Sequence, residues 1–542
     1  MRTLLAALLA LALGATQAQA QAQAQVQTQA SAPDPVPLRI SLDGELQVLD
    51  PHITSAYLTR NFALMVFDQL IAQDSHGHYR PQMLEGWTVS EDGLRYDFTL
   101  REGLEWHDGS PVTAEDCVAS IRRWGARDGM GRLMLAATAS LAVVDARRFS
   151  LQLARPFGFV VEALGKYSSI FPAMMPARLA ATDPTKPIPE VIGSGPYRFA
   201  ASEFRAGDRA VFLRNPRYRP RAEPVDGTAG GKVVHFERAE FVSIPDPTTK
   251  VAALQRGELD YIQRAPFDYL DQLRRDPSVR LAAGAAAPQF MGVVVLNQAQ
   301  PPFDNPLLRQ AVQQLMDQQE FVAALGLPAD MHREQCLSVY TCGSPYESDA
   351  GVAPLRQPSL ERARALMRQA GYANEPVLVF QSTDVPVINT IALVTIDRLR
   401  QAGFNVQVRA TDWSSVAQQR FNRGPLAQGG WSVLPLIWAA EDLATPLSNY
   451  PIANNCANFP GWSCDAATTP LLAAFGAARG LPRQREIAAD IQARAHAEVA
   501  LALAGQFAVP PAYRANLQGL LEVPVPVFWN LHRSQTAPTR AR

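Results

Sequence analysis

The stretch from Pro81 to Trp124 has the most regular alternation of apolar and polar positions in the chain. Two segments, Gly86–Val89 and Arg95–Leu100, flank the turn-forming residues Ser90-Glu91-Asp92-Gly93. The second segment alternates polar residues with the apolar residues Tyr96, Phe98 and Leu100. A period of two on either side of a turn predicts a β-hairpin with one buried face.

A helix is expected soon after this hairpin. Thr113 offers a hydroxyl as N-cap, and Glu115 and Asp116 place carboxylates in the first helical turn. Apolar residues then recur with the spacing of one helix face, at Cys117, Val118, Ile121 and Trp124. The pattern predicts an amphipathic helix that docks on the hairpin.

Other segments show the same two periods. A helical pattern covers Thr59–Ile71. Much later, helical and extended patterns alternate, at Leu360–Ala370, Val377–Gln381, Asn389–Ala402 and Asn405–Arg409. Alternation of this kind is typical of an α/β unit, so the 542-residue chain is expected to contain more than one core.

The block Pro81–Trp124 resembles a known signature over about forty ordered positions. It is similar to the large solute-binding receptors of ATP-driven importers, the extracellular family 5, which carry oligopeptides, dipeptides, nickel chelates and opines. Gly193-Ser194-Gly195-Pro196-Tyr197 resembles a second motif of that family, in which the glycines permit a tight backbone crossing. The resemblance implies an α/β, two-lobed periplasmic-binding-protein fold with an extra subdomain in the first lobe and a hinge between the lobes.

The resemblance also implies a division of the chain. Lobe I covers residues 37–288, with an inserted subdomain at about 75–190, and lobe II covers residues 289–505. Residues 506–533 return to lobe I, and residues 534–542 form a loose polar tail.

The first twenty residues have the layout of a secretory signal peptide: Arg2, the apolar run Leu4–Leu13, and small residues up to an Ala-Gln-Ala cleavage site at residue 20. Residues 21–36 are rich in Ala and Gln without apolar periodicity, which predicts a disordered lead-in. No later run is long and apolar enough for a membrane span, and no Cys follows the apolar run as a lipid anchor. We therefore expect a free periplasmic protein.

The net charge of the chain limits the classes of partner that it is expected to bind. The net charge is −1 and 19% of residues are charged, so the chain has no electrostatic footprint for nucleic acid or an anionic membrane. We expect a monomer without cofactor, whose partners are a small-molecule or peptide ligand and the permease subunits of an ABC transporter.

The five cysteines are interpreted for an oxidising compartment. Cys336 and Cys342 enclose a short loop, and so do Cys456 and Cys464. We predict two local disulfides. Cys117 is expected to be a buried free thiol, and the spacing of these cysteines does not favour zinc.

Candidate ligand contacts come from the resemblance. The segment from Gly429 to Asp442 is similar to a family segment in which aromatic residues wall the cleft and an acid pairs with a ligand ammonium group. This implies that Trp431 and Trp438 are cleft walls and that Glu441 or Asp442 is the acid. Sequence leaves open which acid faces the cleft, and the alternative is that both cap the following helix.

Three further residues complete the candidate set. Phe290 lies on Gln289–Asn297, which resembles the first crossing between lobes. Asp68 stands where family members have an acid near the ligand, and a solvated carboxylate on an amphipathic helix is its alternative. Lys166 lies in a region that faces the cleft in the family.

Metal and catalytic sites are not supported. His76-Gly77-His78 lies in a polar turn, which favours a surface loop over a pair of metal ligands. No Ser, His and Asp arrangement matches a hydrolase motif. The sequence therefore predicts a receptor rather than an enzyme, most simply for a short peptide. Receptors for a nickel chelate, an opine or an oligosaccharide remain alternatives, as does, more remotely, a secreted hydrolase.

Overall fold

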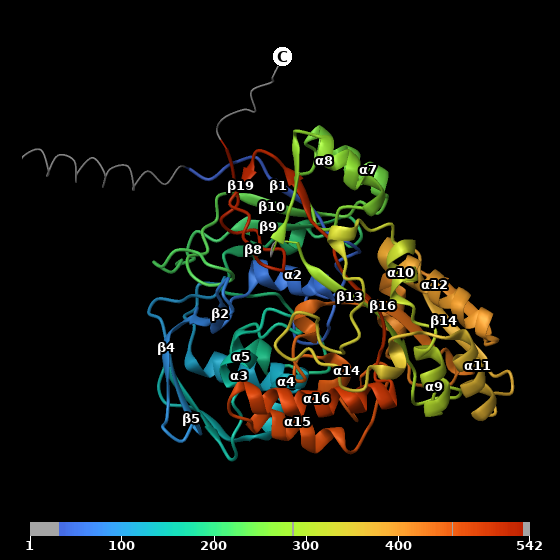
Figure 1. Ribbon diagram of the computed structural model, residues 1–542. Coiled ribbons are helices and arrows are strands. Elements are labelled where there is room, and N and C mark those ends of the chain that lie inside the picture. Colours follow the sequence, from blue (N-terminus) through green and yellow to red (C-terminus); the bar gives the residue numbers. More distant parts are fainter. Residues whose placement is uncertain (1–31, 285–286, 458, 535–542) are drawn as a thin grey trace, which may run out of the picture.

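The computed structural model describes residues 32–284, 287–457 and 459–534 (Figure 1). The predicted signal peptide, most of the Ala/Gln lead-in and all of the tail except Ser534 lie outside these residues. Within them, two large sheets form the centres of two lobes, and a smaller antiparallel sheet forms a subdomain. No helix of the described ranges combines the length and apolarity that a membrane crossing requires.

The sheet of lobe I has the strand order β12-β18-β11-β1-β10-β9-β8 and lies at the top of Figure 1. Strand β1 runs parallel to β10 and β11, and the remaining pairs are antiparallel. The strands are β1 (Leu38–Ser41), β8 (Tyr197–Phe199), β9 (Arg209–Arg214), β10 (Arg238–Val242), β11 (Tyr261–Ile262), β12 (Val279–Leu281) and β18 (Ala512–Arg514). Helices α7 (Pro247–Arg256) and α8 (Leu270–Arg275) pack at one end.

The subdomain contains the predicted hairpin. Its antiparallel sheet has the order β4-β5-β7-β6, with β4 (Leu84–Val89), β5 (Arg95–Leu100), β6 (Thr138–Val143) and β7 (Arg148–Leu153). Phe98 stacks on Phe149 across the buried face at 4.9 Å between ring centroids. Helix α3 (Ala114–Gly125) packs on this sheet, and the predicted N-cap Thr113 is confirmed: Thr113 and Asp116 each accept the other's backbone N–H, which makes a capping box.

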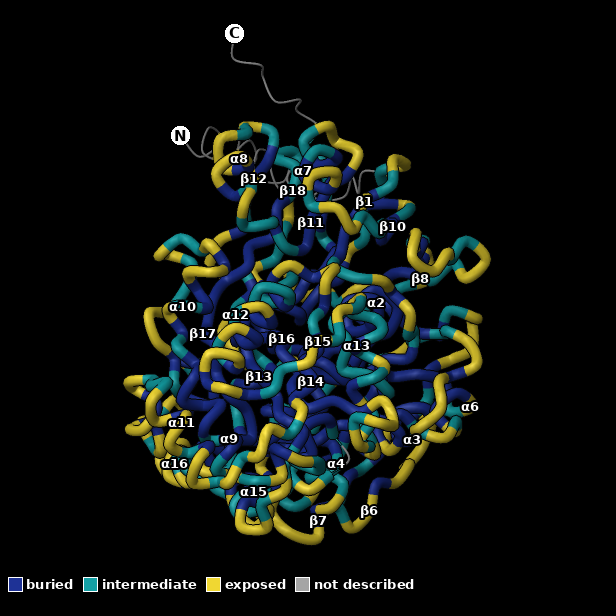
Figure 2. The backbone as a smooth tube through the Cα atoms, turned by 90° about the vertical axis from the view of Figure 1, so that its right-hand side faces the viewer, coloured by how far each residue is buried: buried dark blue, intermediate teal, exposed yellow. Residues whose placement is uncertain are grey.

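The sheet of lobe II has the order β15-β14-β16-β13-β17. Strand β13 (Gln289–Leu296) is antiparallel to β16 (Val433–Ala439) and β17 (Ala502–Ala508), whereas β14 (Pro376–Ser382) is parallel to β15 (Asn405–Thr411) and β16. Strand β16 is buried along its whole length and β13 and β14 along most of theirs, as the dark tubes in Figure 2 show. They are covered by helices α9 (Pro306–Gln313), α10 (Gln318–Ala324), α11 (Leu360–Gln369) and α12 (Pro386–Ala402).

The chain passes from the sheet of lobe I to that of lobe II after β12 and returns after β17. Helices α15 (Thr468–Ala477) and α16 (Leu481–Glu498) run along the bottom of Figure 1, next to the subdomain. There Phe475 stacks on Phe159 at 5.2 Å, and the N–H of Gly158 donates to the carbonyl of Gly476. The two crossings are the natural hinge positions of the fold.

The predicted helix at 59–71 is wrong at its end. Helix α2 covers Tyr57–Val66, and the chain is extended from Phe67, before strand β2 (Ile71–Gln73) pairs with β3 (Tyr79–Pro81). The reason is a long-range contact: the N–H of Gly195 donates to the carbonyl of Val66 at 2.9 Å. The backbone of the glycine motif therefore crosses where the helix would continue.

The crossing depends on the missing side chain of Gly193. A Cβ atom there would lie 2.0 Å from the carbonyl oxygen of Val66, which is backbone and cannot rotate away. We expect Gly193→Ala to lower the free energy of unfolding by about 3 kcal/mol, at the upper end of overpacking costs. Urea unfolding monitored by circular dichroism measures the change.

The matched control is Gly86→Ala on β4, where a Cβ atom would meet nothing within 4 Å. The control is expected to unfold as the wild-type protein does. A Gly193→Ala midpoint equal to that of the control would contradict this account of the crossing.

Candidate functional site

A cavity of about 840 Å³ lies between the lobes. Its lobe I side comes from β3, the loop before helix α5 (Val160–Gly165) and the residues after it, and its lobe II side comes from residues 333–346 and 440–448. Small-molecule sites in proteins have volumes of roughly 300–1,000 Å³. The cavity is therefore large enough for a solute of a few residues.

Two acids follow β16, and the first of them, Glu441, lines this cavity. Glu441 Oε1 accepts a hydrogen bond from Arg60 Nη1 of α2 at 3.0 Å, and Asp442 Oδ2 accepts one from the hydroxyl of Tyr57 at 2.7 Å. The Tyr57 hydroxyl in turn accepts the N–H of Ala439 at 2.6 Å. We call this set of contacts, Tyr57 and Arg60 on lobe I with Ala439, Glu441 and Asp442 on lobe II, the polar seam.

Asp442 is fully used within the structure. It is 0% exposed, and besides Tyr57 it accepts the N–H of Ser169 at 3.2 Å and the Ser169 hydroxyl at 3.4 Å. Its carboxylate connects the lobes, and both of its oxygens accept hydrogen bonds from the protein.

Glu441 differs from its neighbour. It lines the cavity, and its Oε2 atom is buried and accepts no hydrogen bond from the described residues. Burial raises the pKa of Glu441 above its usual range; the Arg60 guanidinium opposes this shift, and the charge of Asp442 adds to it. Of the two acids that the sequence could not separate, Glu441 is the one that lines the cavity.

Arg420 is a buried cation that the sequence analysis missed. It lies directly after helix α13 (Trp413–Gln419), is 7% exposed, and lines a small cavity of about 50 Å³ with Tyr57 and Trp438. Its Nη2 donates to the hydroxyl of Ser55 at 3.1 Å. Its Nε has no partner, and no carboxylate of the described chain forms an ion pair with it.

A buried guanidinium without an anion is costly, since burial removes its hydration. Burial lowers the pKa of Arg420 to about 10. The site is therefore complementary to an anion such as a carboxylate. In the sequence Arg420 looks like a solvated charge, and only the burial created by Tyr57, Trp413 and Trp438 reveals it.

The aromatic candidates Trp438, Trp431 and Phe290 differ in their positions relative to this small cavity. Trp438 lines it directly. Trp431 is fully buried against Phe380 and Trp462, and its Nε1 donates to the carbonyl of Arg420 at 2.9 Å, so it supports the position of Arg420. Phe290 is absent from the lining of both cavities and packs behind Tyr57, at 6.3 Å between ring centroids.

Asp68 is placed away from the ligand-sized cavity. It is 1% exposed, and its carboxylate accepts from Lys232 Nζ at 2.7 Å and from the Tyr218 hydroxyl at 2.9 Å. The alternative of a solvated carboxylate on a helix is therefore wrong, because α2 has already ended and the acid is buried in lobe I. This pairing supports a structural role.

Lys166 does line the cavity, but its charge is compensated. Its Nζ donates to Asp128 Oδ2 at 2.5 Å, and Asp128 is also the N-cap of helix α4 (Gly129–Ala136). Lys166 thus contributes to the cavity wall without a free charge.

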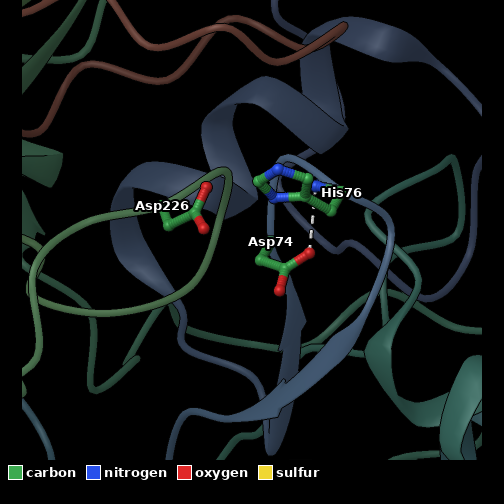
Figure 3. A group of neighbouring side chains, drawn as sticks. All are labelled: Asp74, His76 and Asp226. Carbon is green, nitrogen blue, oxygen red and sulfur yellow. Dashed lines mark hydrogen bonds between the residues drawn. The ribbon is translucent and has the colours of Figure 1, made fainter.

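Hydrogen bonds explain the conformation of the turn His76-Gly77-His78. Asp74, His76 and Asp226 have possible ligand atoms within 4.8 Å of one another (Figure 3). Asp74 Oδ1 accepts the backbone N–H groups of His76 and His78 at 3.0 and 2.8 Å, and Oδ2 accepts from Arg80 Nε at 2.9 Å. The Asp74 carboxylate therefore caps the turn, and we assign the group a structural role.

Both predicted disulfides are confirmed. Cys336 is bonded to Cys342 and Cys456 to Cys464, and Cys117 is a buried free cysteine. Cys342 lies in the wall of the large cavity, so the first disulfide closes a loop at its rim.

Comparisons with known proteins agree with this architecture. The family model described as "Bacterial extracellular solute-binding proteins, family 5 Middle" matches residues 78–454. A probable peptide ABC transporter periplasmic-binding protein of Sinorhizobium fredii is 33% identical over 502 residues, which are 92% of this chain and 93% of that protein.

Solved structures share the fold at low identity. The PBP AgaA of A. tumefaciens R10 in complex with agropinic acid has a TM-score of 0.78 at 20% identity, over 93% of this chain and 99% of that one. The periplasmic binding protein DppA of Helicobacter pylori in complex with the peptide STSA has a TM-score of 0.77 at 18% identity, over 92% and 98%. The predicted two-lobed α/β fold is confirmed. The chain therefore belongs to the bacterial extracellular solute-binding proteins of family 5, and it is an extracytoplasmic transport receptor rather than an enzyme.

Proposed function

We propose that the protein is a periplasmic receptor for short peptides that delivers them to the permease of an ABC importer. The observation that carries the proposal is the pair of incompletely satisfied charges between the lobes: Glu441 Oε2 has no partner, and Arg420 has no anion among the described residues. A peptide with free ends has one ammonium group and one carboxylate. Glu441 is suited to the first and Arg420 to the second.

The relatives support the same class of ligand. The relative from Sinorhizobium fredii is named as a peptide transporter component, and DppA was solved with a peptide. AgaA was solved with agropinic acid, so an opine is the competing ligand within this fold. Two disulfides fit an oxidising compartment such as the periplasm.

Closure of the lobes couples to binding through the polar seam. In the structure, Arg60 compensates one oxygen of Glu441 and leaves the other unpaired. With the lobes together Glu441 Oε2 is buried without a partner, and a ligand ammonium group would supply that partner. Such a difference in contacts shifts the equilibrium between open and closed forms toward the closed form.

The first prediction concerns the two ends of the ligand. Wild-type protein should bind Ala-Ala with free ends at least about tenfold more tightly than its N-acetylated or C-amidated forms, a difference of about 1.4 kcal/mol for each end. Glu441→Gln should remove the preference for the free amine and keep that for the free carboxylate. Arg420→Gln should do the reverse. Isothermal titration calorimetry measures all nine affinities.

Asp442→Asn provides the matched control, because it changes one carboxylate at the same turn that lies outside the cavity lining. It is expected to weaken all three forms of the dipeptide alike by loosening the polar seam. The proposal fails if the wild-type protein binds neither these dipeptides nor any peptide of greater length. It also fails if blocking either end of the dipeptide leaves the affinity unchanged.

The second prediction is a pH dependence of the ligand-free protein. The raised pKa of Glu441 means that the native state retains a proton that the unfolded state releases near 4.5. Stability from this source is present at low pH and is lost as pH rises from 4.5 through the raised pKa, with a slope of at most about 1.4 kcal/mol per pH unit. Urea unfolding at several pH values between 5 and 8 measures it.

The comparison with Glu441→Gln isolates this contribution. Burial lowers the pKa of His52, His107 and His496 to about 4, which gives a dependence of the opposite sign in both proteins. Wild-type stability minus variant stability should therefore fall as pH rises. A difference that is constant or that increases with pH would show that Glu441 is ionised throughout.

A further inference from the structure

The large cavity has a second acid, remote in sequence from the polar seam. Glu162 lies in the first turn of α5 and lines the cavity. Its carboxylate forms no ion pair and no hydrogen bond with any other residue that the structure describes. Burial raises the pKa of Glu162 above its usual range. An acid in this state lacks a counter-charge, and the open space beside it is the cavity.

Three aromatic rings share the cavity wall with this acid: Tyr79, Phe159 and Tyr346. Burial raises the pKa of Tyr79 and of Tyr346, and in both cases the Glu162 charge adds to the shift. Phe159 and Tyr346 are fixed by packing on Phe475, at 5.2 and 5.3 Å between ring centroids. Aromatic rings and a carboxylate in one cavity wall favour an organic cation over a hydrated metal ion.

The cations of the cavity do not compensate Glu162. Lys166 is paired with Asp128, and Arg333 lies exposed at the lobe II side. The cavity wall thus contains Glu441, which has one oxygen without a partner, and Glu162, which has no ion pair among the described residues.

Tyr167 belongs to the same wall. Burial raises the pKa of Tyr167, and Glu441 and Tyr79 both add to the shift. Tyr79, Glu162, Tyr167 and Glu441 all line the one large cavity. One molecule bound in it can therefore reach both acids.

We propose that Glu162, with Tyr79, Phe159 and Tyr346, forms a subsite for the basic side chain of a bound peptide, so that the receptor prefers peptides containing lysine or arginine. This inference rests on the proposed function, because it assigns the main-chain ammonium group to Glu441. The ammonium or guanidinium group pairs with the carboxylate, and the aliphatic part of the side chain packs between the rings.

The test compares tripeptides that differ in one charge. Lys-Ala-Ala, Ala-Lys-Ala and Ala-Ala-Lys are each measured by calorimetry against the same peptide with Nε-acetyl-lysine, and Ala-Ala-Ala serves as reference. For at least one position, wild-type protein should prefer lysine at least about tenfold. Glu162→Gln should reduce that preference to less than about twofold and leave the affinity for Ala-Ala-Ala unchanged.

Glu91→Gln is the control, since it removes the same charge from the exposed hairpin turn, outside the cavity lining. It should keep the full lysine preference. If Glu162→Gln also loses Ala-Ala-Ala, Glu162→Asp decides, because it keeps the charge: a retained lysine preference supports the subsite and a lost one overturns it.

The outcomes separate the two proposals. Peptide binding without a lysine preference, or with a preference that Glu162→Gln leaves intact, overturns the subsite and leaves the proposed function standing. Failure of the wild-type protein to bind any of the seven peptides at concentrations up to about 1 mM overturns both.

Discussion

The polar seam between Arg60 and Tyr57 on one lobe and Glu441 and Asp442 on the other is the interaction on which the functional form of the molecule depends. Each lobe has its own sheet and its own core, and the chain crosses between the sheets only after β12 and after β17 within the described residues. A further apolar cluster joins the subdomain to lobe II, where Phe159 stacks on Phe475. The seam adds charged and hydroxyl groups to these apolar contacts.

The polar character of the seam has a physical consequence. An apolar interface would keep the lobes together whether or not a solute was present, because it needs no third partner. Buried charges behave differently, since each one that lacks a counter-charge costs several kcal/mol. In the closed structure Glu441 Oε2 and the Nε of Arg420 are buried without partners. The closed form is therefore incomplete by itself, and a solute with complementary ends completes it.

Local features were accessible from the sequence. The hairpin at 84–100, the N-cap Thr113 and the two short disulfide loops were predicted correctly, since each is specified by residues a few positions apart. The fold followed from the resemblance carried by Pro81–Trp124, which lies in the subdomain and contributes little to the cleft. The same stretch that identifies the family is therefore uninformative about the ligand.

The missed features depend on contacts across hundreds of residues. Helix α2 ends at Val66 because the N–H of Gly195 donates to the Val66 carbonyl. Asp68 is buried where Lys232 and Tyr218 donate hydrogen bonds to its carboxylate. Glu441 and Asp442 are adjacent, yet Tyr57 and Ser169 donate hydrogen bonds only to Asp442. Arg420 gives no sequence signal at all, since its importance comes from burial alone. Charge in a cleft is thus a property of the assembled lobes.

The most direct test of this account is native mass spectrometry of the protein as it is purified, without removal of bound solute. The account predicts a mass excess that corresponds to a single peptide of about two to five residues, with a free ammonium group and a free carboxylate. Recovery of a solute that lacks either group, such as an oligosaccharide or a nickel complex of a ligand without an amine, would contradict it.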